Sequence, residues 1–356
     1  VNDALIESLI LRLCKSLVHI EFENVKVTDI SLFQIGRLCK ELRSFSLIHC
    51  KGVTDDGLLE LAKRVRLSHI KVCHNMAITD KGIKKLLATS KGLKSLDLLD
   101  CPRITSEPLI SLYDTALAWG SKRSDKAAPL EVLSLRGNVN LTPDVFLHVG
   151  LNSLNLIELD LRDCENLELL PACKNLEALE NLQVLKIGPC TIQHDPDELV
   201  DSLLTFTDSL TVLHLYEMDI FEDEHVAELL ENSTELDEFF VSDVQVGEKT
   251  VEALCSYLPN VQRLAIHNSN KINDKEVRCI AASLPTMKEL TVSGCRQITD
   301  EAFSRCSHLH LTSIDVSRCP TPLDGSLLAC FSNSPLQSIC LNDNSLSFQT
   351  EGDNAS

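Results

Sequence analysis

The chain has 356 residues, of which 33 are Lys or Arg and 52 are Asp or Glu, so its formal net charge is −19. We expect no nucleic-acid partner, because an excess of carboxylates repels phosphates. We also expect no membrane span, because the apolar stretches are far shorter than the roughly 20 residues needed to cross a bilayer. Aromatic residues make up only 4% of the chain, which favours a thin, repetitive core over a single globular one.

The first residues, 1–16, match the helical half of a repeat. Val1, Asn2 and Asp3 resemble the residues that begin later helices, and Leu5 and Leu9 follow at helical spacing. A stack of repeats that ends in this way leaves apolar core exposed. We therefore expect further sequence upstream in the natural polypeptide.

One hydrophobic phrase, L-x-x-L-x-L, recurs thirteen times along the chain, usually every 25 or 26 residues. Its apolar residues fall two or three apart, which predicts a short strand with one buried face. A fixed period in this range predicts a solenoid. The phrases begin at Leu17, Leu42, Leu67, Leu93, Leu130, Leu156, Leu182, Leu210, Leu236, Val261, Met287, Leu311 and Leu336.

A small residue often stands eight positions after the start of a phrase. We expect its side chain to turn inward and to satisfy backbone groups that lose their sheet partners in the turn. Asparagine suits this task by hydrogen bonding, and cysteine suits it because it is easily buried. The residues are Cys50, Asn75, Cys101, Asn138, Cys164, Cys190, Cys295, Cys319 and Asn344.

A helix start follows the turn. Thr54, Thr79, Thr299 and Asn273 are each followed by an aspartate, and we expect the first residue to cap the helix and the aspartate to lie near the positive end of its dipole. Thr142-Pro143 predicts proline at the first helical position. Apolar residues then recur at helical spacing, as in Leu58, Leu61 and Ala62 or Ile83, Leu86 and Leu87.

Two stretches depart from the period. The phrases at Leu93 and Leu130 are 37 residues apart, and we interpret residues 113–129, which include Trp119, as a loop insertion. After Leu346 the sequence turns polar, and residues 346–356 are predicted to form a C-terminal tail.

Each repeat is therefore a strand, a turn and a helix, and neighbours must stack to bury their apolar faces. The predicted α/β architecture has a parallel sheet on a concave face and helices on a convex face, since helices are wider than the spacing between strands.

The phrase, with its Cys or Asn and the following I/V-T-D-x-G/A, resembles the cysteine-containing leucine-rich repeat. The clearest copies combine Cys50 with Thr54 to Leu58 and Cys295 with Thr299 to Phe303. The resemblance implies a leucine-rich-repeat solenoid shaped as a curved horseshoe, with about 12 to 13 repeats in a single domain over residues 1–345. Such repeats are typical of F-box substrate receptors of ubiquitin ligases and of cell-cycle and repair regulators that have no F-box.

The 15 cysteines are an odd number and form no C-x-x-C pair. Most of them fall at positions set by the repeat, so we expect free thiols in a reducing compartment, the cytoplasm or the nucleus.

Charge is distributed unevenly. Residues 1–126 hold 20 basic and 15 acidic residues, whereas residues 127–356 hold 13 and 37. No Lys or Arg lies between Lys186 and Lys249. This acidic band has two interpretations: a solvated helix face, or a surface that attracts a basic segment of a partner. Its acids include Asp195, Asp197, Glu198, Asp201, Glu222, Asp223, Glu224, Glu228, Glu231, Glu235, Asp237 and Glu238.

Binding residues are expected on the concave face, at offsets two, four, six and seven from each phrase start, because these side chains point away from the core. Tyr216 and Phe240 fall in adjacent repeats and are residue types that dominate binding energies, although an aromatic ring there could instead only cover a neighbour. The candidate partner-binding residues are Arg136, Asp160, Arg162, Asp163, Lys186, His214, Tyr216, Glu217, Phe240 and His267.

A secondary patch combines His49, Cys73 and His74, with His19 and His69 on the same side. A zinc site there would need Cys50 as well, and we expect Cys50 to be committed to the core, so no metal is predicted. The patch fits titratable partner contacts better.

The nucleotide-binding, zinc-protease and serine-hydrolase motifs are missing from the sequence. We therefore expect neither an enzyme nor a cofactor, because an open sheet supplies surface more readily than an enclosed pocket.

The leading hypothesis is a scaffold for protein–protein interaction that resembles the substrate-recognition domain of an F-box ubiquitin-ligase subunit. The resemblance implies an upstream F-box that binds a Skp-type adaptor, and a concave face that binds a partner with a basic segment. The alternative is a non-ligase regulator or inhibitor that occludes the surface of a basic partner. A third hypothesis, a sensor for a small ligand, would depend on Arg136, Arg162 and Lys186.

Overall fold

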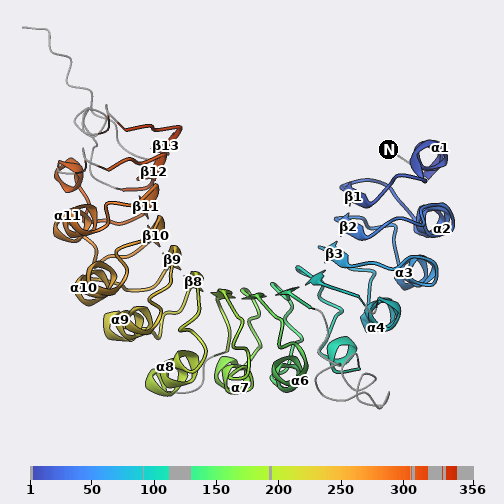
Figure 1. Cartoon of the computed structure of the whole chain (residues 1–356), viewed down its shortest axis with the longest axis horizontal. Coiled ribbons are helices and arrows are strands. Elements are labelled where there is room, and N and C mark those ends of the chain that lie inside the picture. Colours follow the sequence, from blue (N-terminus) through green and yellow to red (C-terminus); the bar gives the residue numbers. More distant parts are fainter. Residues whose placement is uncertain are drawn as a thin grey trace, which may run out of the picture. The chain divides into compact units, whose positions relative to one another are not determined.

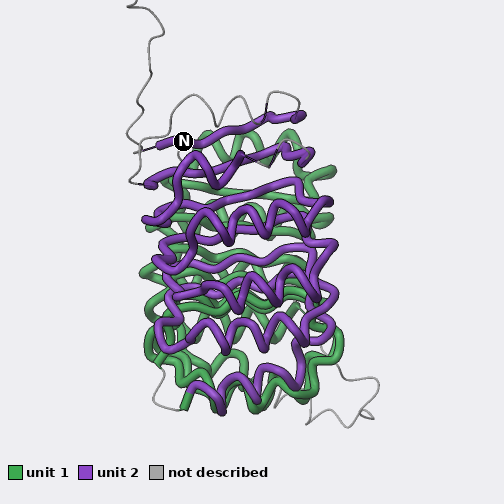
Figure 2. Tube along the Cα trace, turned by 90° about the vertical axis from the view of Figure 1, so that its left-hand side faces the viewer, with its two compact units in different colours: residues 1–195 green, residues 196–356 purple. Residues whose placement is uncertain are grey.

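The computed structural model describes residues 3–90, 92–111, 130–191, 195–304, 306, 309–319, 331 and 334–342. They belong to two compact units, Val1–Asp195 (unit 1) and Pro196–Ser356 (unit 2), which Figure 2 shows in different colours. Each unit is a stack of strand–turn–helix repeats, and each is described by itself.

Unit 1 contains a sheet of parallel strands whose order follows the sequence, β1 to β7. Its strands are β1 His19–Glu23, β2 Ser44–Ile48, β3 His69–Cys73, β4 Ser95–Asp97, β5 Val132–Ser134, β6 Glu158–Leu161 and β7 Val184–Ile187. Its described helices are α1 Asp3–Leu13, α2 Asp29–Leu38, α3 Asp55–Ala62, α4 Asp80–Thr89, α6 Asp144–Asn152 and α7 Leu169–Lys174.

Unit 2 repeats the same arrangement with strands β8 to β13. The strands are β8 Val212–Tyr216, β9 Glu238–Ser242, β10 Arg263–His267, β11 Glu289–Ser293, β12 Ser313–Asp315 and β13 Ser338–Cys340. The described helices are α8 Pro196–Leu204, α9 Asp223–Asn232, α10 Glu248–Tyr257, α11 Asp274–Ser283 and the 3-10 helix η2 Asp300–Phe303.

In each unit the helices pack on one side of the sheet, and we call the opposite side the strand face (Figure 1). Every strand begins two residues after the start of a predicted phrase, so the thirteen predicted strands are confirmed. The pairing joins equivalent positions of neighbouring repeats, for example Phe45 with Ile70. The leucines of the phrases form the core, and Leu96 and Leu98 are fully buried.

The predicted role of the small turn residue is also confirmed. The Asn75 amide donates to the Cys50 carbonyl at 3.1 Å and accepts from the backbone N–H groups of Ala77 and Ile78. The Cys50 Sγ lies 3.4 Å from the carbonyl oxygen of Phe22, in the preceding repeat. The other cysteines of this position are buried in the same way, except that Cys190 is half-buried. Asn344 lies outside the described residues.

At the residue before the small turn residue, the backbone leaves the strand in the left-handed conformation. Its φ is near +50° to +60° in most of the repeats that have a non-glycine residue there. Asn, Asp, His and Gly tolerate this conformation better than β-branched residues do. His49, His74, Asp163 and Asp243 stand at this position, and their residue types suit its backbone conformation.

The predicted helix starts are largely confirmed. The side chains of Thr54, Thr79, Asn273 and Thr299 each accept a hydrogen bond from the backbone two residues on. There are two differences: the segment after Thr299 is a short 3-10 helix, and α6 begins one residue after Pro143, which keeps a helical φ of −58° as the cap.

Several aspartates that follow such caps also bind the next repeat, which the dipole argument did not predict. The carboxylate of Asp29 accepts from both the N–H and the hydroxyl of Thr54, at 2.8 and 2.7 Å, in the next repeat. Asp55 holds Thr79 and Asp274 holds Thr299 in the same way. We call these contacts between neighbouring repeats the aspartate latches.

The glycine of T-D-x-G makes room for the latch. A Cβ atom on Gly57 would lie 2.2 Å from Oδ1 of Asp29, and one on Gly82 would lie 2.4 Å from Oδ1 of Asp55. Neither distance is sterically allowed with the carboxylate in this position, so a methyl group on Gly57 or Gly82 would displace the carboxylate of the preceding repeat.

The predicted insertion at 113–129, with Trp119, and the predicted tail at 346–356 lie outside the described residues. Within the described residues, every helix is too short or too polar to cross a bilayer.

Candidate functional site

The strand face of unit 2 carries a cluster of rings. On β9 the side chains alternate, with Phe239 and Val241 buried and Phe240 partly exposed. His214 stands directly across from Phe240 in the strand pairing. We call His214, Tyr216, Phe240 and His267 the aromatic cluster.

Phe240 is the centre of the aromatic cluster. Its ring centroid lies 4.5 Å from that of Tyr216 in a stacked arrangement with an interplanar angle of 29°. The rings of His214 and His267 are tilted against it at 5.1 and 4.9 Å. Four side chains from three neighbouring strands thus form one continuous surface.

Ion pairs fix one side of the cluster. Glu238 accepts from Nε2 of His214 at 2.6 Å and from Nε of Arg263 at 2.5 Å. Burial acts to raise the pKa of Glu238, but the hydrogen bonds from Arg263 and His214 outweigh it and lower that pKa. His214 is therefore held in place and only 9% exposed, although its offset in the repeat predicted an outward-pointing side chain.

His267 forms the other side of the cluster. Burial lowers the pKa of His267, against the opposing influence of Asp315 and Asp243, while Arg318 acts in the same direction as burial. His267 thus presents an uncharged ring to Phe240.

Exposed carboxylates border the cluster. Glu217 and Asp243 directly follow β8 and β9, both are exposed, and both have left-handed backbone conformations. Asp243 accepts hydrogen bonds from Asn268 and from Ser242. We call Glu217 and Asp243 the carboxylate rim.

The strand face of unit 1 is dominated by ion pairs. Asp160 accepts two hydrogen bonds from Arg162, at 2.9 and 2.6 Å, and its side chain is only 7% exposed. Arg136 pairs with Asp163 at 2.6 Å, and Lys186 pairs with Glu158 at 2.7 Å. A small anionic ligand would depend on Arg136, Arg162 and Lys186. All three are therefore already paired with carboxylates.

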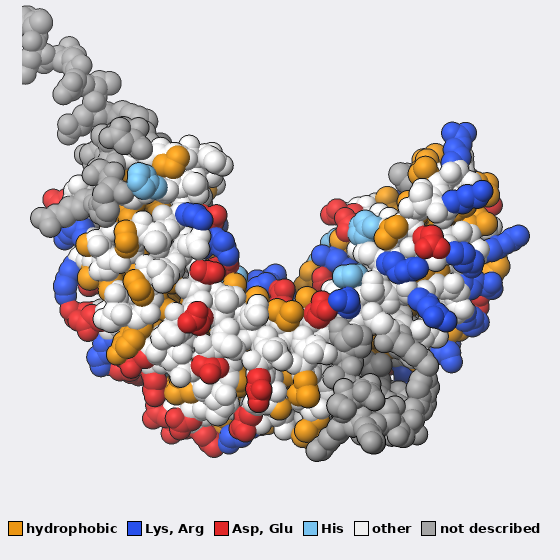
Figure 3. Space-filling model, in the orientation of Figure 1, with side chains coloured by type: hydrophobic (Ala, Val, Ile, Leu, Met, Phe, Trp, Pro, Cys, Tyr) orange, Lys and Arg blue, Asp and Glu red, His pale blue; other side chains and the backbone are white. Residues whose placement is uncertain are grey.

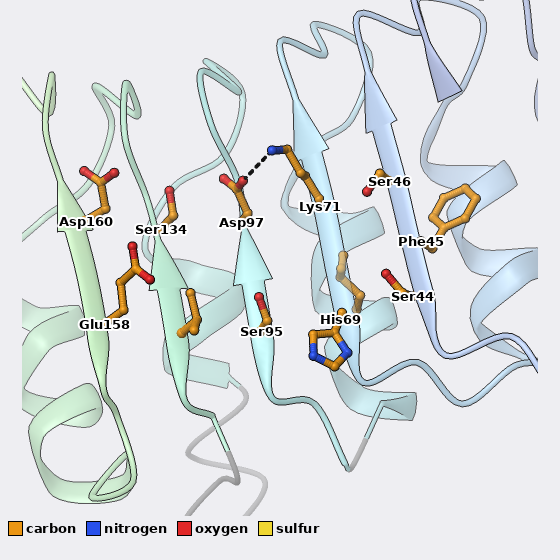
Figure 4. A pocket seen from close by; sticks show the side chains of 12 residues that line it. Ser44, Phe45, Ser46, His69, Lys71, Ser95, Asp97, Ser134, Glu158 and Asp160 are labelled. Carbon is orange, nitrogen blue, oxygen red and sulfur yellow. Dashed lines mark ion pairs between the residues drawn. The ribbon is translucent and has the colours of Figure 1, made fainter. Parts of the chain in front are cut away.

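A shallow groove of about 300 Å³ lies on the same face, over β2 to β6 (Figure 4). Small serines leave the space, with Lys71 and Asp97 paired at 3.4 Å between them. The sequence argument missed this groove, although serines at offsets two and four of neighbouring repeats were its signal. Its small residues are Ser44, Ser46, Ser95 and Ser134.

The histidines of the secondary patch stack on each other. The rings of His49 and His74 are 4.2 Å apart and nearly parallel, and Nδ1 of His74 lies 2.9 Å from Asp100. Cys73 is buried, and this burial raises the pKa of its thiol to about 12. Within the described residues, no group of three or more His, Cys, Asp or Glu side chains is arranged to hold a metal ion.

Much of the acidic band lies on helices instead of the strand face. Asp197, Glu198 and Asp201 belong to α8, and Glu224, Glu228 and Glu231 belong to α9. Figure 3 shows acidic side chains gathered over these helices. This placement favours the solvated helix face over a direct extension of the binding surface.

No protein-family model matches the chain. Among solved structures, it is similar to an internalin (InlF) of Listeria monocytogenes, with 18% identity, a TM-score of 0.55, and 97% of this chain and 89% of that chain covered. It is also similar to a chain of the yeast Rad7–Elc1 complex, with 14% identity, a TM-score of 0.64, and coverage of 98% and 84%.

A third similar structure is TLR13 in complex with the single-stranded RNA ssRNA13, with 16% identity, a TM-score of 0.55, and coverage of 94% of this chain and 50% of that one. These neighbours are leucine-rich-repeat proteins. The stacked parallel strands and helices of this chain therefore have the predicted fold, a leucine-rich-repeat solenoid.

Proposed function

We propose that this chain is a protein-recognition scaffold that binds a segment of a partner on the strand face of unit 2. The observation that carries the proposal is the aromatic cluster, in which Tyr216 and Phe240 stack at 4.5 Å on a side of the sheet that the described helices leave open. Rigid, partly exposed aromatic side chains contribute strongly to binding because little conformational entropy is lost when they are covered.

The chemistry of the surface favours a basic partner segment. The faces of Tyr216 and Phe240 attract a cationic side chain, and the carboxylate rim, Glu217 and Asp243, can neutralise the same charge. An Arg side chain satisfies both requirements, because its guanidinium group stacks on rings and donates hydrogen bonds in its plane.

Unit 1 contributes less to this proposal. Arg136, Arg162 and Lys186 are paired with carboxylates of their own unit, so binding there would require these ion pairs to open. Reversing the charge of Arg162 would also leave the buried Asp160 without its partner. A loss of binding in such a variant could then result from a loss of stability.

Binding of arginine-rich and lysine-rich peptides, measured by fluorescence anisotropy, tests the recognition surface. Tyr216→Ala and Phe240→Ala should each weaken binding by about 1 to 3 kcal/mol. Tyr257→Ala is the matched control, because Tyr257 is 45% exposed but belongs to helix α10. Equal loss in all three variants, or no loss in the first two, would refute the proposed surface.

In its finer form, the proposal is that the chain is the substrate-recognition part of an F-box type ubiquitin-ligase subunit. The resemblance of its repeats to those of F-box receptors supports this role, and the similarity to a chain of the Rad7–Elc1 complex supports assembly with other proteins. Affinity purification of the full-length protein with mass spectrometry tests it. Recovery of a Skp-type adaptor and a cullin is expected, whereas one stoichiometric basic protein without them would indicate the regulator that acts by occlusion.

A further inference from the structure

Two cysteines on neighbouring helices of unit 2 lie unusually close together. Sγ of Cys255, on α10, is 3.9 Å from Sγ of Cys279, on α11, and 3.7 Å from the carbonyl oxygen of Cys279. Cys279 is exposed and Cys255 is half-buried. Both sulfur atoms thus lie near the surface of the helical side of the unit.

This pair differs from the cysteines of the turns. Cys101 and Cys295 are fully buried, lie close to backbone carbonyls, and have pKa values raised by burial to about 11 and about 12. These thiols fulfil the repeat's structural requirement and are shielded from reagents. Cys255 and Cys279 fall outside the turn position, so that requirement does not account for them.

We propose that Cys255 and Cys279 form a peroxide-sensitive dithiol that closes into an intramolecular disulfide between neighbouring repeats. A disulfide has an S–S length of about 2.05 Å, so the sulfur atoms must approach by about 2 Å. Rotation of the two side chains between staggered positions can supply a movement of this size.

The reaction has two steps and uses hydrogen peroxide as the oxidant. In the first, the Cys279 sulfur takes one peroxide oxygen, the O–O bond breaks, and a sulfenic acid and one water are formed. In the second, the Cys255 sulfur attacks the sulfenyl sulfur, the S–O bond breaks, and the hydroxide leaves as water with the thiol proton. Two thiols have then lost two electrons in total, and the peroxide has been reduced to water.

The environment of the two thiols determines which reacts first. Burial raises the pKa of Cys255 to about 11, with Cys279 adding to the effect and a hydrogen bond with Ser283 opposing it. Cys255 is therefore almost entirely protonated at neutral pH, and a protonated thiol is a poor nucleophile. Cys279, which is exposed, is the site of peroxide attack. Cys255 resolves the sulfenic acid because its sulfur lies 3.9 Å away, and this proximity compensates for its small thiolate fraction.

The disulfide would connect the repeats at the centre of the aromatic cluster. Helix α10 follows the strand that carries Phe240, and α11 follows the strand that carries His267. Oxidation would thus restrict the relative movement of the two repeats whose rings are 4.9 Å apart.

The test exposes the reduced full chain to hydrogen peroxide at neutral pH, blocks the remaining thiols with a maleimide and maps disulfide-linked peptides by mass spectrometry. The wild type and Cys14→Ser, which removes a half-buried thiol of unit 1, should both give the Cys255–Cys279 cross-link. Cys255→Ser should lose the cross-link and accumulate a sulfenic acid at Cys279 that reacts with dimedone. Cys279→Ser should leave Cys255 reduced.

Three results would overturn the proposal. One is over-oxidation of Cys279 to a sulfinic acid in the wild type while Cys255 remains free. Another is a cross-link that disappears on dilution and therefore joins two chains. The third is oxidation of Cys255 in Cys279→Ser at the wild-type rate, which would reverse the assigned order of attack.

Discussion

Gly82 is constrained by a carboxylate of the preceding repeat as well as by its own helix. Alanine favours a helix over glycine by about 1 kcal/mol, so position 82 of α4 would ordinarily gain from a methyl group. The latch between Asp55 and Thr79 prevents this, because the space that a methyl group needs is occupied by Oδ1 of Asp55.

We predict that Gly82→Ala lowers the free energy of unfolding by about 1 to 3 kcal/mol, measured by denaturant titration. Gly92→Ala is the matched control, because a Cβ atom there meets nothing within 4 Å. In an Asp55→Ala background, Gly82→Ala should no longer destabilise. An equal loss with and without Asp55 would show that the latch is not the cause.

The ionisation of Asp223 makes the free energy of unfolding of unit 2 depend on pH. Burial acts to raise its pKa, but hydrogen bonds from Thr250 and from the backbone of Lys249 and Gly247 outweigh this and lower it. A carboxyl group whose pKa is lowered by folding contributes its full stability above its unfolded pKa of about 4, and loses that contribution as the pH falls through the folded-state pKa.

We therefore predict that Asp223→Asn is less stable than the wild type at pH 7, and that the difference narrows below about pH 4. Denaturant unfolding of both proteins across this pH range is the measurement. A difference that stays constant with pH would contradict the assigned role of the ionised carboxylate.

At the scale of the element, asparagine and cysteine perform the same turn task with different strengths. Asn75 makes one hydrogen bond as donor and two as acceptor, all to the backbone, at 2.9 to 3.2 Å. Cys50 offers only weak S–H contacts with two carbonyl oxygens at 3.4 Å. Both side chains fill the space in the turn, but only the amide of Asn75 forms strong hydrogen bonds with the backbone groups that have lost their sheet partners.

Asn75→Ala should cost about 2 to 4 kcal/mol of unfolding free energy, because it leaves buried backbone groups without partners. Cys50→Ala should cost about 1 kcal/mol, mostly through lost packing. Thermal and denaturant unfolding of the two variants would test this order, and a larger loss for Cys50→Ala would refute it.

At the scale of the whole molecule, each repeat packs mainly on its sequence neighbours. The aspartate latches and the strand pairing both join consecutive repeats. Stability in such a stack is shared between nearest neighbours, so local damage should spread only over adjoining repeats.

We predict that Leu96→Asp, which places a carboxylate in the core of unit 1, increases amide hydrogen exchange in β3 to β5 while β10 and β11 stay protected. Leu290→Asp is the matched variant, since Leu290 is likewise buried in β11, and the pattern should be reversed. Uniform loss of protection in either variant would show that the chain unfolds as one cooperative body.

The amino-acid sequence alone determined the number and position of the strands, the inward turn residues and most helix caps of the described residues. These features repeat with a fixed period, and each depends on a local pattern such as the alternation in Leu93, Leu96 and Leu98 or the pair Thr54-Asp55.

Only the tertiary structure decided which side chains meet. The pairing of Arg162 with Asp160, the contact of Phe240 with Tyr216, and the approach of Cys255 to Cys279 all depend on side-chain rotation and on the register between repeats. The period places such residues in neighbouring positions, but it does not determine whether a charge stays exposed, pairs internally or packs beneath a ring. Those outcomes follow from competition between burial and hydrogen bonding at each position, which is resolved only when the repeats are stacked.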